Sequence, residues 1–371
     1  MTTISHLRRS ASQMWAWIQA IDRFVRLYIL FFPVSCVLLG AASVPHDLTA
    51  GQLGALVAVA TCFQIYTYAF NDVIDLSIDR INPARRQDPL VRGVLTPRQA
   101  VLIGVVQPLL AIPLTMALGA GAAAYITLAA SFALMGAYNV WGKRCPFPPL
   151  TDAAQGLAWS GLTVYGAQAI GVTPTWLTWW TAAYLTVFTL LFNGIYGPFR
   201  DLTSDFAAGA KTTAIVFGAR PASAGSGRHV PTAVSVYAWF LLAVLVGMNA
   251  VLMFRNDFHY GTSTWVLTAC IVGALNVWAV LLQPQVLHPR ESATDVAWRL
   301  QMFILMTVLP IAFFASAGAG ILLTLAFLNA LALVLFDCTS AVTRWAWGII
   351  GAVGLVVHEE HGPPSRITHA D

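Results

Sequence analysis

Charged residues are scarce in this chain. Asp, Glu, Lys and Arg together make up 10% of its 371 residues, whereas 58% are hydrophobic, and the mean hydropathy is +0.70. A soluble domain carries charge on roughly a quarter of its residues. The composition therefore excludes an ordinary soluble protein and indicates one that is solvated by lipid. The net charge of +4 follows from the membrane topology described below, and no nucleic-acid partner is expected.

Cysteine is also rare, and its spacing excludes a thiolate metal site. The five cysteines lie at positions 36, 62, 145, 270 and 338, and no two of them form a CxxC pair. We therefore expect no zinc or redox motif. Most of these cysteines are expected to pack as small apolar side chains.

The first 22 residues contain no acid until Asp22 and are too polar for the core of a signal peptide. An organellar transit peptide fits this composition, but Trp15 and Trp17 favour a surface helix at the membrane interface. We treat residues 1–22 as a separate N-terminal segment.

Long apolar runs recur along the rest of the chain. About 20 such residues span a hydrocarbon core as a helix. Nine runs have this character, near 24–44, 52–71, 99–118, 122–141, 153–171, 176–196, 231–254, 263–283 and 300–317, and 319–336 is a candidate tenth. Residues 338–357 fit either a span or an interfacial helix. The sequence predicts an all-α multi-pass membrane protein, with one transmembrane domain over 23–357 and a polar tail over 358–371.

Lys and Arg set the expected orientation of these helices. If the N-terminus is cytoplasmic, the loops after the first, third and fifth spans are external, and they contain no Lys or Arg. The loops after the second, fourth and sixth spans hold the basic residues Arg80, Arg85, Arg86, Arg92, Lys143, Arg144, Arg200, Lys211, Arg220 and Arg228. This is the positive-inside pattern, and it places the ends of the even-numbered spans in the cytoplasm.

Acids gather at the cytoplasmic end of the second span, where the chain reads NDVIDLSIDR over 71–80. Asp72, Asp75 and Asp79 are spaced i, i+3, i+7, so on a helix they share one face. Like charges in this arrangement repel one another. A divalent cation reverses that effect, because Mg²⁺ takes a few carboxylates and completes its shell with water and substrate phosphate. A solvated helix end is the alternative for a single Asp.

A second acidic cluster ends the sixth span, where 192–205 reads FNGIYGPFRDLTSD. Both clusters begin Phe-Asn and end Asp-Leu-x-x-Asp, with Asp75 and Asp79 in the first and Asp201 and Asp205 in the second. The match indicates a degenerate internal repeat. Two such clusters could hold a diphosphate between metal ions.

Basic residues follow each cluster and are candidates for clamping that diphosphate. Arg85, Arg86 and Arg92 come after the first cluster, and Lys211 comes after the second. Cations in such places stabilise the charge that develops on a departing diphosphate. For any one of them, topology and lipid headgroup contact give the alternative reading.

Taken in order, these motifs resemble the UbiA superfamily of intramembrane prenyltransferases. The resemblance runs from about residue 20 to 255 and is carried by NDxxDxxxD at 71–79, DPLVRG at 88–93, DxxxDxxxGxKT at 201–212 and the residues Tyr138, Lys143, Arg144, Gln155 and Gly156. It implies a ring of about nine transmembrane helices around a central cavity. It also implies Mg²⁺ as cofactor, a prenyl diphosphate as substrate and transfer to an acceptor that is often aromatic. The implied site residues are Asn71, Asp72, Asp75, Asp79, Asp201 and Asp205 for catalysis and metal, with Lys143, Arg144, Arg85, Arg86, Lys211 and Tyr138 for the diphosphate.

Two departures from the family pattern leave the reaction open. Pro198 stands where many relatives carry a further Asp. Phe31 and Phe32 precede Pro33 where relatives that bind an acidic aromatic acceptor often have a basic residue, although Arg23 and Arg26 lie nearby. Because aromatic faces stabilise cations, cyclisation of the prenyl chain without an acceptor is an alternative to transfer. A transporter or lipid-binding protein is a third reading, of another class.

Overall fold

The structure is a computed structural model, and it describes residues 23–222, 227–255, 257–288, 296–314 and 317–336. The N-terminal segment 1–22, the candidate interfacial helix 338–357 and the tail 358–371 lie outside the described residues.

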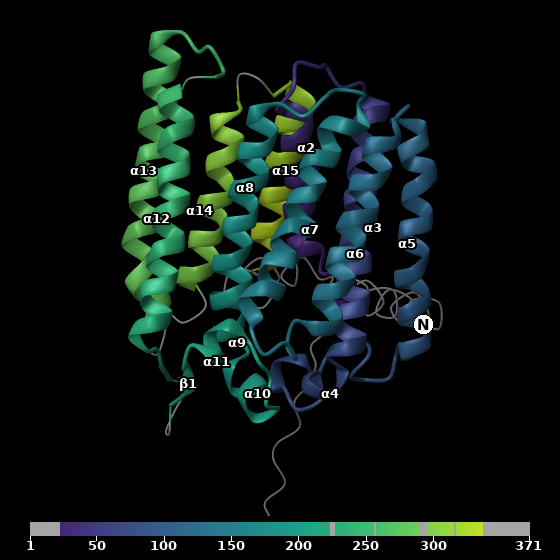
Figure 1. Cartoon of the computed structure of the whole chain (residues 1–371), viewed down its shortest axis with the longest axis vertical. Helices are drawn as coiled ribbons and strands as arrows, with labels where there is room; N and C mark the ends of the chain where they lie inside the picture. The colour runs from purple at the N-terminus through teal and green to yellow at the C-terminus, as the bar shows by residue number, and fades with distance from the viewer. Residues whose placement is uncertain (1–22, 223–226, 256, 289–295, 315–316, 337–371) are drawn as a thin grey trace, which may run out of the picture.

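Ten helices of at least twelve residues stand side by side in the described part of the chain (Figure 1). They are α2 (Phe31–Ala42), α3 (Ala50–Ile74), α5 (Pro97–Ala117), α6 (Ala122–Trp141), α7 (Pro148–Ala169), α8 (Trp176–Leu191), α12 (Thr232–Arg255), α13 (Thr262–Leu287), α14 (Val296–Ala312) and α15 (Ala319–Phe336). Ten helices thus include the candidate tenth run, and the prediction of an all-α membrane fold is confirmed. Within the described ranges, six segments are long and apolar enough to cross a membrane: α3, α5, α6, the continuous stretch Trp176–Arg200, α12 and α13.

These helices form a closed ring. Going round it, α3, α6, α7, α8, α12, α13, α14, α15 and α2 each pack on the next, and α2 returns to α3. Helix α5 packs outside the ring against α3, at the opposite edge of the molecule from α12 and α13 (Figure 1). Fifteen of the 22 residues of α7 are buried, which makes it an interior wall rather than a lipid-facing helix.

Small residues allow α2 and α7 to approach closely. A Cβ placed on Gly40 of α2 would lie 1.9 Å from the carbonyl oxygen of Thr163, and one on Gly166 of α7 would lie 2.1 Å from that of Val37. Backbones come this near only where side chains are missing, as is common between membrane helices. The contact fixes the position of α7, which lines the cavity described below.

Local signals in the sequence explain where several helices begin. Thr49, Thr96 and Thr175 stand at the N-termini of α3, α5 and α8, and each forms a capping box with the residue three positions later. Such a pair satisfies backbone N–H groups that have no partner inside the helix.

The first predicted span, 24–44, is wrong in its extent. Helix α2 begins only at Phe31, because the chain turns at Arg26, whose φ of 53° is left-handed, and then forms the 3₁₀ turn η1 (Leu27–Ile29). Gln64 Nε2 donates to the Arg26 carbonyl oxygen at 3.0 Å. This bond and the ion pair described below hold the turn in place.

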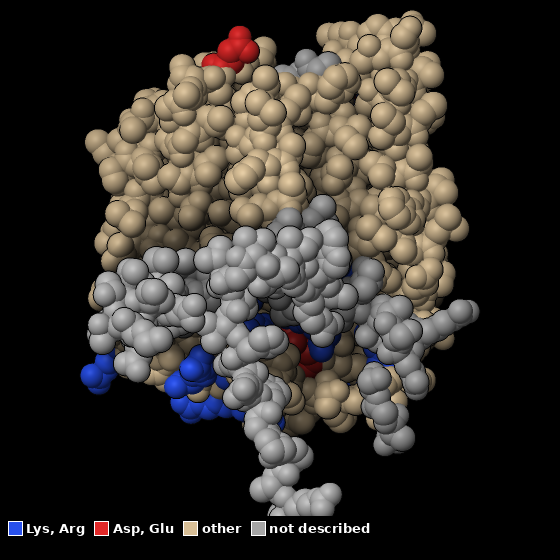
Figure 2. All heavy atoms as spheres, turned by 180° about the vertical axis from the view of Figure 1, so that it is seen from behind, with Lys and Arg blue, Asp and Glu red and all other residues tan. Residues whose placement is uncertain are grey.

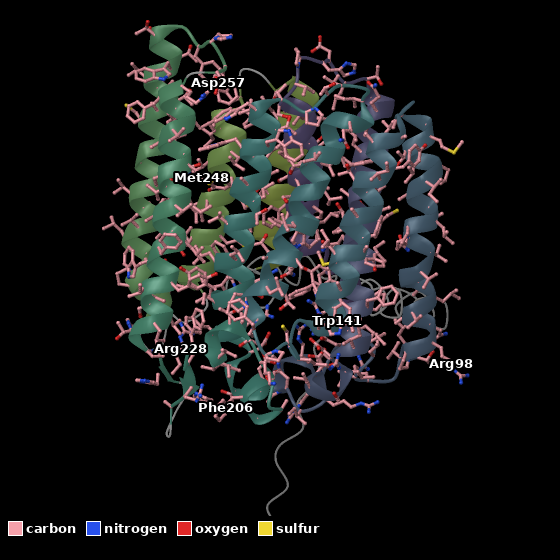
Figure 3. All side chains as sticks on the ribbon, in the orientation of Figure 1. Arg98, Trp141, Phe206, Arg228, Met248 and Asp257 are labelled. Atoms are coloured by element: carbon pink, nitrogen blue, oxygen red, sulfur yellow. The ribbon has the colours of Figure 1, made fainter. Side chains whose placement is uncertain are left out.

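Short elements gather at one end of the ring, which we call the charged end (Figure 1). They are α4 (Leu76–Asp79), η2 (Pro83–Arg85), the π-helical turn η3 (Phe192–Tyr196), α9 (Gly197–Arg200), α10 (Leu202–Ala207), α11 (Thr213–Val216), and the paired strands β1 (Arg220–Pro221) and β2 (Arg228–His229). Figure 2 shows Lys and Arg side chains gathered there, with acidic atoms between them, below a surface that shows almost no charge apart from acidic atoms at the opposite end. Trp141 and Phe206 mark this end in Figure 3, and Asp257 marks the opposite end.

Candidate active site

A cavity lies inside the ring and reaches the charged end. Side chains from α3, α6, α7, α8, α10 and α14 line it, together with Arg26 and Ile29 from the turn before α2 and Phe32 from α2. Its polar part holds carboxylates from both acidic clusters. Its other part is aromatic, so the cavity has a charged end and an apolar end.

The first acidic cluster sits on a break between two helices. Helix α3 ends at Ile74, Asp75 has φ −90° and ψ 3°, and α4 starts at the next residue. Asp75 and Asp79 both line the cavity and are only 6% and 7% exposed. Asn71, one turn earlier, also lines it and donates from Nδ2 to Asp75 at 3.4 Å.

Asp72 has a different environment from the other two acids of its cluster. It is not among the residues that line the cavity. Its carboxylate forms a buried ion pair with Arg26, which does line the cavity. The structure therefore brings Asp75 and Asp79 together with the second cluster, and it uses Asp72 to hold the turn before α2.

The second cluster repeats the backbone arrangement of the first. Asp201, with φ −100° and ψ 11°, stands at the break between α9 and α10, and Asp205 lies one turn later. Both line the cavity. Asn82, which follows the first cluster in the chain, donates from Nδ2 to Asp201 at 3.4 Å. The sequence repeat thus corresponds to a repeated helix break that directs two carboxylates into one space.

The π-helical turn η3 prepares this second break. It widens the end of α8 over Phe192–Tyr196, and Asn193 within it lines the cavity, as Asn71 does in the first cluster. Such turns occur mostly at functional sites. Buried Tyr196 donates its hydroxyl to Gln283 of α13, which anchors the turn to the C-terminal helices.

Lys143 lies between the two clusters. Its Nζ is 3.1 Å from a carboxylate oxygen of Asp75 and 3.0 Å from one of Asp205. Two further cations lie beside the cluster carboxylates. Arg200 pairs with Asp201 at 2.6 Å, and Arg85 lies 4.0 Å from Asp79.

The remaining predicted cations lie away from the cavity. Arg144 donates to the carbonyl oxygens of Val140, at 2.8 Å, and Ile74, at 3.5 Å. Arg86 and Lys211 are exposed. Arg92 is exposed as well. None of these four basic residues is among the lining residues, whereas Tyr138 is.

Burial and neighbouring charges move the pKa values at the charged end in different directions. Burial raises the pKa of Asp79 to about 6 against the opposing effect of Arg85. Burial also raises the pKa of Asp205, although Lys143 opposes it. For Asp201, burial acts in the same sense, but Arg200, Arg85 and Lys143 together outweigh it, and the pKa falls well below its usual range. The pKa of Lys143 is lowered by burial but raised by its two carboxylates, and the net change is upward, so this lysine stays charged.

The apolar end of the cavity is built from aromatic rings. Phe32 stacks on Phe188 at 5.5 Å between centroids and meets Trp159 edge-on at 5.1 Å, and Phe188 stacks on Phe192 at 4.5 Å. All four rings line the cavity. Of the two phenylalanines singled out in the sequence, only Phe32 does so, because Phe31 turns away and stacks on Phe303.

Sequence reasoning missed one acid of the cavity. Asp152, in the second turn of α7, lines it and is 6% exposed, and Thr213 donates its hydroxyl to the Asp152 carboxylate. It belongs to no acidic motif. The signal available in the sequence was a single Asp at the start of an apolar run, three residues before Gln155.

The donor set of the cavity fits a hard divalent cation. Among the described residues no three His, Cys, Asp or Glu lie close enough together to form a ready metal cluster. Four carboxylates from two clusters nevertheless face the same cavity. Two of them, from Asp75 and Asp205, lie 3.1 and 3.0 Å from the Lys143 ammonium, so one positive charge already contacts both clusters. Mg²⁺ needs only one or two carboxylates beside water and phosphate oxygens, so the residues present match its requirements.

Residues 30–305 match the UbiA prenyltransferase family. The mitochondrial 4-hydroxybenzoate polyprenyltransferase of Saccharomyces cerevisiae is 26% identical over 250 residues, which are 67% of this chain and 64% of that protein. The 4-hydroxybenzoate octaprenyltransferase of Saccharophagus degradans is 30% identical over 221 residues, covering 55% and 66%. The digeranylgeranylglyceryl phosphate synthase of Thermococcus sibiricus is 29% identical over 204 residues, covering 52% and 68%. The chain thus spans slightly less than two thirds of the length of the first two relatives.

Solved structures share the fold. A UbiA homologue from Archaeoglobus fulgidus bound to GPP and Mg²⁺ superimposes with a TM-score of 0.61 at 14% identity, over 80% of this chain and 99% of that one. The apo structure of a UbiA homologue from Aeropyrum pernix K1 gives 0.57 at 18% identity, over 80% and 97%. At these identities the likeness establishes the arrangement of helices.

Proposed function

This chain belongs to the UbiA prenyltransferase family, and from that premise we propose that it is a Mg²⁺-dependent intramembrane enzyme. Its reaction ionises a prenyl diphosphate and transfers the prenyl group to an acceptor. One observation carries this proposal. Two acidic pairs, placed by two equivalent helix breaks, face a single cavity whose opposite end is aromatic.

The charged end supplies the residues for the diphosphate. We assign Asn71, Asp75, Asp79, Asp201 and Asp205 to the metal site, because each lines the cavity. Bound Mg²⁺ would supply the positive charge that lets these carboxylates tolerate a diphosphate beside them.

Three cations complete the charge balance. Lys143, Arg85 and Arg200 line the cavity, and each is paired with a cluster carboxylate. When diphosphate arrives, their positive charge can be shared between carboxylate and phosphate oxygens. Charge placed in advance where a leaving group develops its own charge stabilises the transition state.

The aromatic end supports the prenyl chain and the cation formed from it. In the proposed reaction the C1–O bond breaks, and its electron pair leaves with the diphosphate. Phe32, Trp159 and Phe188 present ring faces and edges to the cavity. Such rings stabilise a positive charge without reacting as readily as an oxygen or nitrogen would.

The test is a product analysis on purified protein with Mg²⁺ and a panel of prenyl diphosphates, each with and without hydroxylic and phenolic acceptors. We expect prenylated acceptor, detected by mass. A cyclic hydrocarbon or terpene alcohol formed without acceptor would instead establish cyclisation, the reading that the aromatic wall also supports. Intact prenyl diphosphate in every reaction would refute both enzymatic readings and favour a transport or lipid-binding role.

We further assign the charged end to the cytoplasm. The loops after the second, fourth and sixth predicted spans lie at this end and carry the ten Lys and Arg residues named above, which is the positive-inside pattern. Single cysteines introduced at Lys211 and at Asp257, in a background in which all five native cysteines are replaced by Ser or Ala, test this in sealed vesicles. A maleimide that cannot cross the membrane should label the two positions from opposite sides. Labelling of both from the same side would refute the topology.

A further inference from the structure

Asp152 differs from the other acids of the cavity in its partners. Each cluster acid that lines the cavity has a Lys or Arg nitrogen within 4.0 Å. Asp152 has no ion pair with any described residue. Its Oδ2 accepts the hydroxyl hydrogen of Thr213, and no side chain or backbone group in the described ranges donates to Oδ1. A buried carboxylate without a cation has no evident use in binding a diphosphate.

Gln155 lies one turn after Asp152 on the same face of α7. Gln155 is 6% exposed and lines the same cavity, and its Oε1 is buried with no hydrogen-bond partner among the described residues. Leaving a buried amide oxygen unpaired costs free energy. Of the described residues whose buried amide oxygen lacks a partner, Gln155 and Asn139 are the two that line the cavity, where a ligand could complete the pairing.

Asp152 and Gln155 lie between the charged end and the aromatic end of the cavity. Asp152, Gln155 and Trp159 are spaced i, i+3, i+7, so they form one stripe along α7, and all three line the cavity. The stripe runs from the polar end towards the aromatic wall. A group held on Asp152 and Gln155 therefore lies beside the path of the prenyl chain and apart from the four paired carboxylates.

The two unengaged oxygens also select the kind of ligand. Oδ1 of Asp152 and Oε1 of Gln155 both accept hydrogen bonds, so the matching group must donate. A hydroxyl donates, whereas a carboxylate or phosphate only accepts and would be repelled by Asp152. The carboxylate oxygen of Asp152 is a stronger base than the amide oxygen of Gln155, so a proton leaving the ligand would move to Asp152.

We propose that Asp152 and Gln155 form the acceptor site of this cavity, where they bind a neutral hydroxyl-bearing acceptor, and that Asp152 takes the proton of that hydroxyl. This inference rests on the proposed transferase function. The acceptor O–H bond breaks, and its proton moves to Oδ1. The C1–O bond of the prenyl diphosphate breaks with its electron pair on the diphosphate, and the acceptor oxygen supplies the electron pair of the new bond to C1.

The decisive variant is Asp152→Asn, which keeps the shape of the side chain and an acceptor for Thr213. Transfer to a phenol should fall by about 10²- to 10⁴-fold, the usual worth of a positioned general base. Mg²⁺-dependent binding of an unreactive prenyl thiolodiphosphate should stay at the wild-type level, because Asp152 is not assigned to the diphosphate.

A series of ring-substituted phenols separates a proton acceptor from a structural anchor. Their pKa values should run from about 10, the value of an unsubstituted phenol group, to below the assay pH. The ratio of wild-type to Asp152→Asn rates should be largest for the least acidic phenol and should fall towards one as the phenol ionises by itself. The matched control Thr213→Val removes the hydroxyl but keeps the carboxylate, and its rate ratio should be small and constant across the series.

Three results would overturn the inference. One is an Asp152→Asn rate ratio that does not vary with phenol acidity, and another is a Thr213→Val loss of the same size. The third is a wild-type enzyme that consumes prenyl diphosphate and needs no acceptor. If Asp152→Asn does not accumulate as folded protein, Gln155→Leu replaces it, and an unchanged acceptor KM in that variant would refute the site. A wild-type protein that neither binds the thiolodiphosphate nor consumes any prenyl diphosphate would refute the proposed function itself.

Discussion

Removing the charge of Lys143 should destabilise the metal-free protein and make it more responsive to Mg²⁺. The Lys143 Nζ lies 3.1 Å from Asp75 and 3.0 Å from Asp205, so those two carboxylate oxygens are at most about 6 Å apart. The side chains of Asp75 and Asp205 are 9% and 2% exposed, and that of Lys143 is 26% exposed. In Lys143→Met the carboxylates face each other with no cation between them.

The size of the effect follows from these distances. At an effective dielectric constant of about 20, two like charges about 6 Å apart repel by about 3 kcal/mol. Removing one partner of a buried ion pair typically costs about 3–5 kcal/mol, and the partial exposure of Lys143 favours the lower figure. With an unfolding entropy of about 2 cal/mol/K per residue, a loss of about 3 kcal/mol lowers the Tm of a 371-residue chain by about 4 °C.

The assay is thermal unfolding in detergent, with and without Mg²⁺, for wild type and variant. Because a cation bound between the carboxylates replaces the missing ammonium, Mg²⁺ should raise the Tm of Lys143→Met more than that of the wild type. Arg144→Met is the matched control, since Arg144 donates to backbone carbonyls and to no side chain of the described residues, and it stands next to Lys143 in the chain. Equal Mg²⁺ responses in Lys143→Met and wild type would refute the view that both clusters share one cation site.

Three further predictions follow from other features of the molecule. Thorough chelation of divalent metal should abolish prenyl transfer, and Mg²⁺ should restore it; full activity after chelation would rule out the metal mechanism. Arg26→Met should destabilise the fold by about 3–5 kcal/mol by leaving the buried Asp72 unpaired, and Arg26→Met with Asp72→Leu should unfold at a higher temperature than Arg26→Met alone. Gly40→Ala should lower the Tm or the yield of folded protein, because its Cβ would lie 1.9 Å from the Thr163 oxygen, whereas Gly54→Ala, with no atom within 4 Å, should not; equal behaviour of the two would contradict the close packing of α2 on α7.

The membrane helices and the two acid pairs were predictable because both are local properties. A run of about 20 apolar residues identifies a helix without knowledge of its neighbours. The Asp-Leu-x-x-Asp repeat likewise places Asp75 with Asp79 and Asp201 with Asp205 at the ends of helices, and the structure brings these four residues to one cavity.

The partner of each acid was not predictable, because partners come from distant parts of the chain. Asp72 is three residues from Asp75 and shares its face on a continuous helix, yet it pairs with Arg26, 46 positions away. The break in the helix at Asp75 and the left-handed turn at Arg26 together separate the two acids. Neither conformation is indicated by a glycine or a proline, since Arg26 is not a glycine and no proline precedes the break.

The charge on Arg26 bears on the nature of the acceptor. Phe32 lines the cavity at the position where the family resemblance leads us to expect a basic residue for an acidic acceptor, and Arg26 is a cation that lines the same cavity. Its guanidinium, however, is already paired with Asp72 and lies over the ring of Tyr68 at 4.3 Å. An acidic acceptor would have to compete with Asp72 for this charge, and it would also meet the carboxylate of Asp152. The charges of the cavity therefore favour a neutral hydroxylic acceptor, which agrees with the hydrogen-bond acceptors that α7 presents.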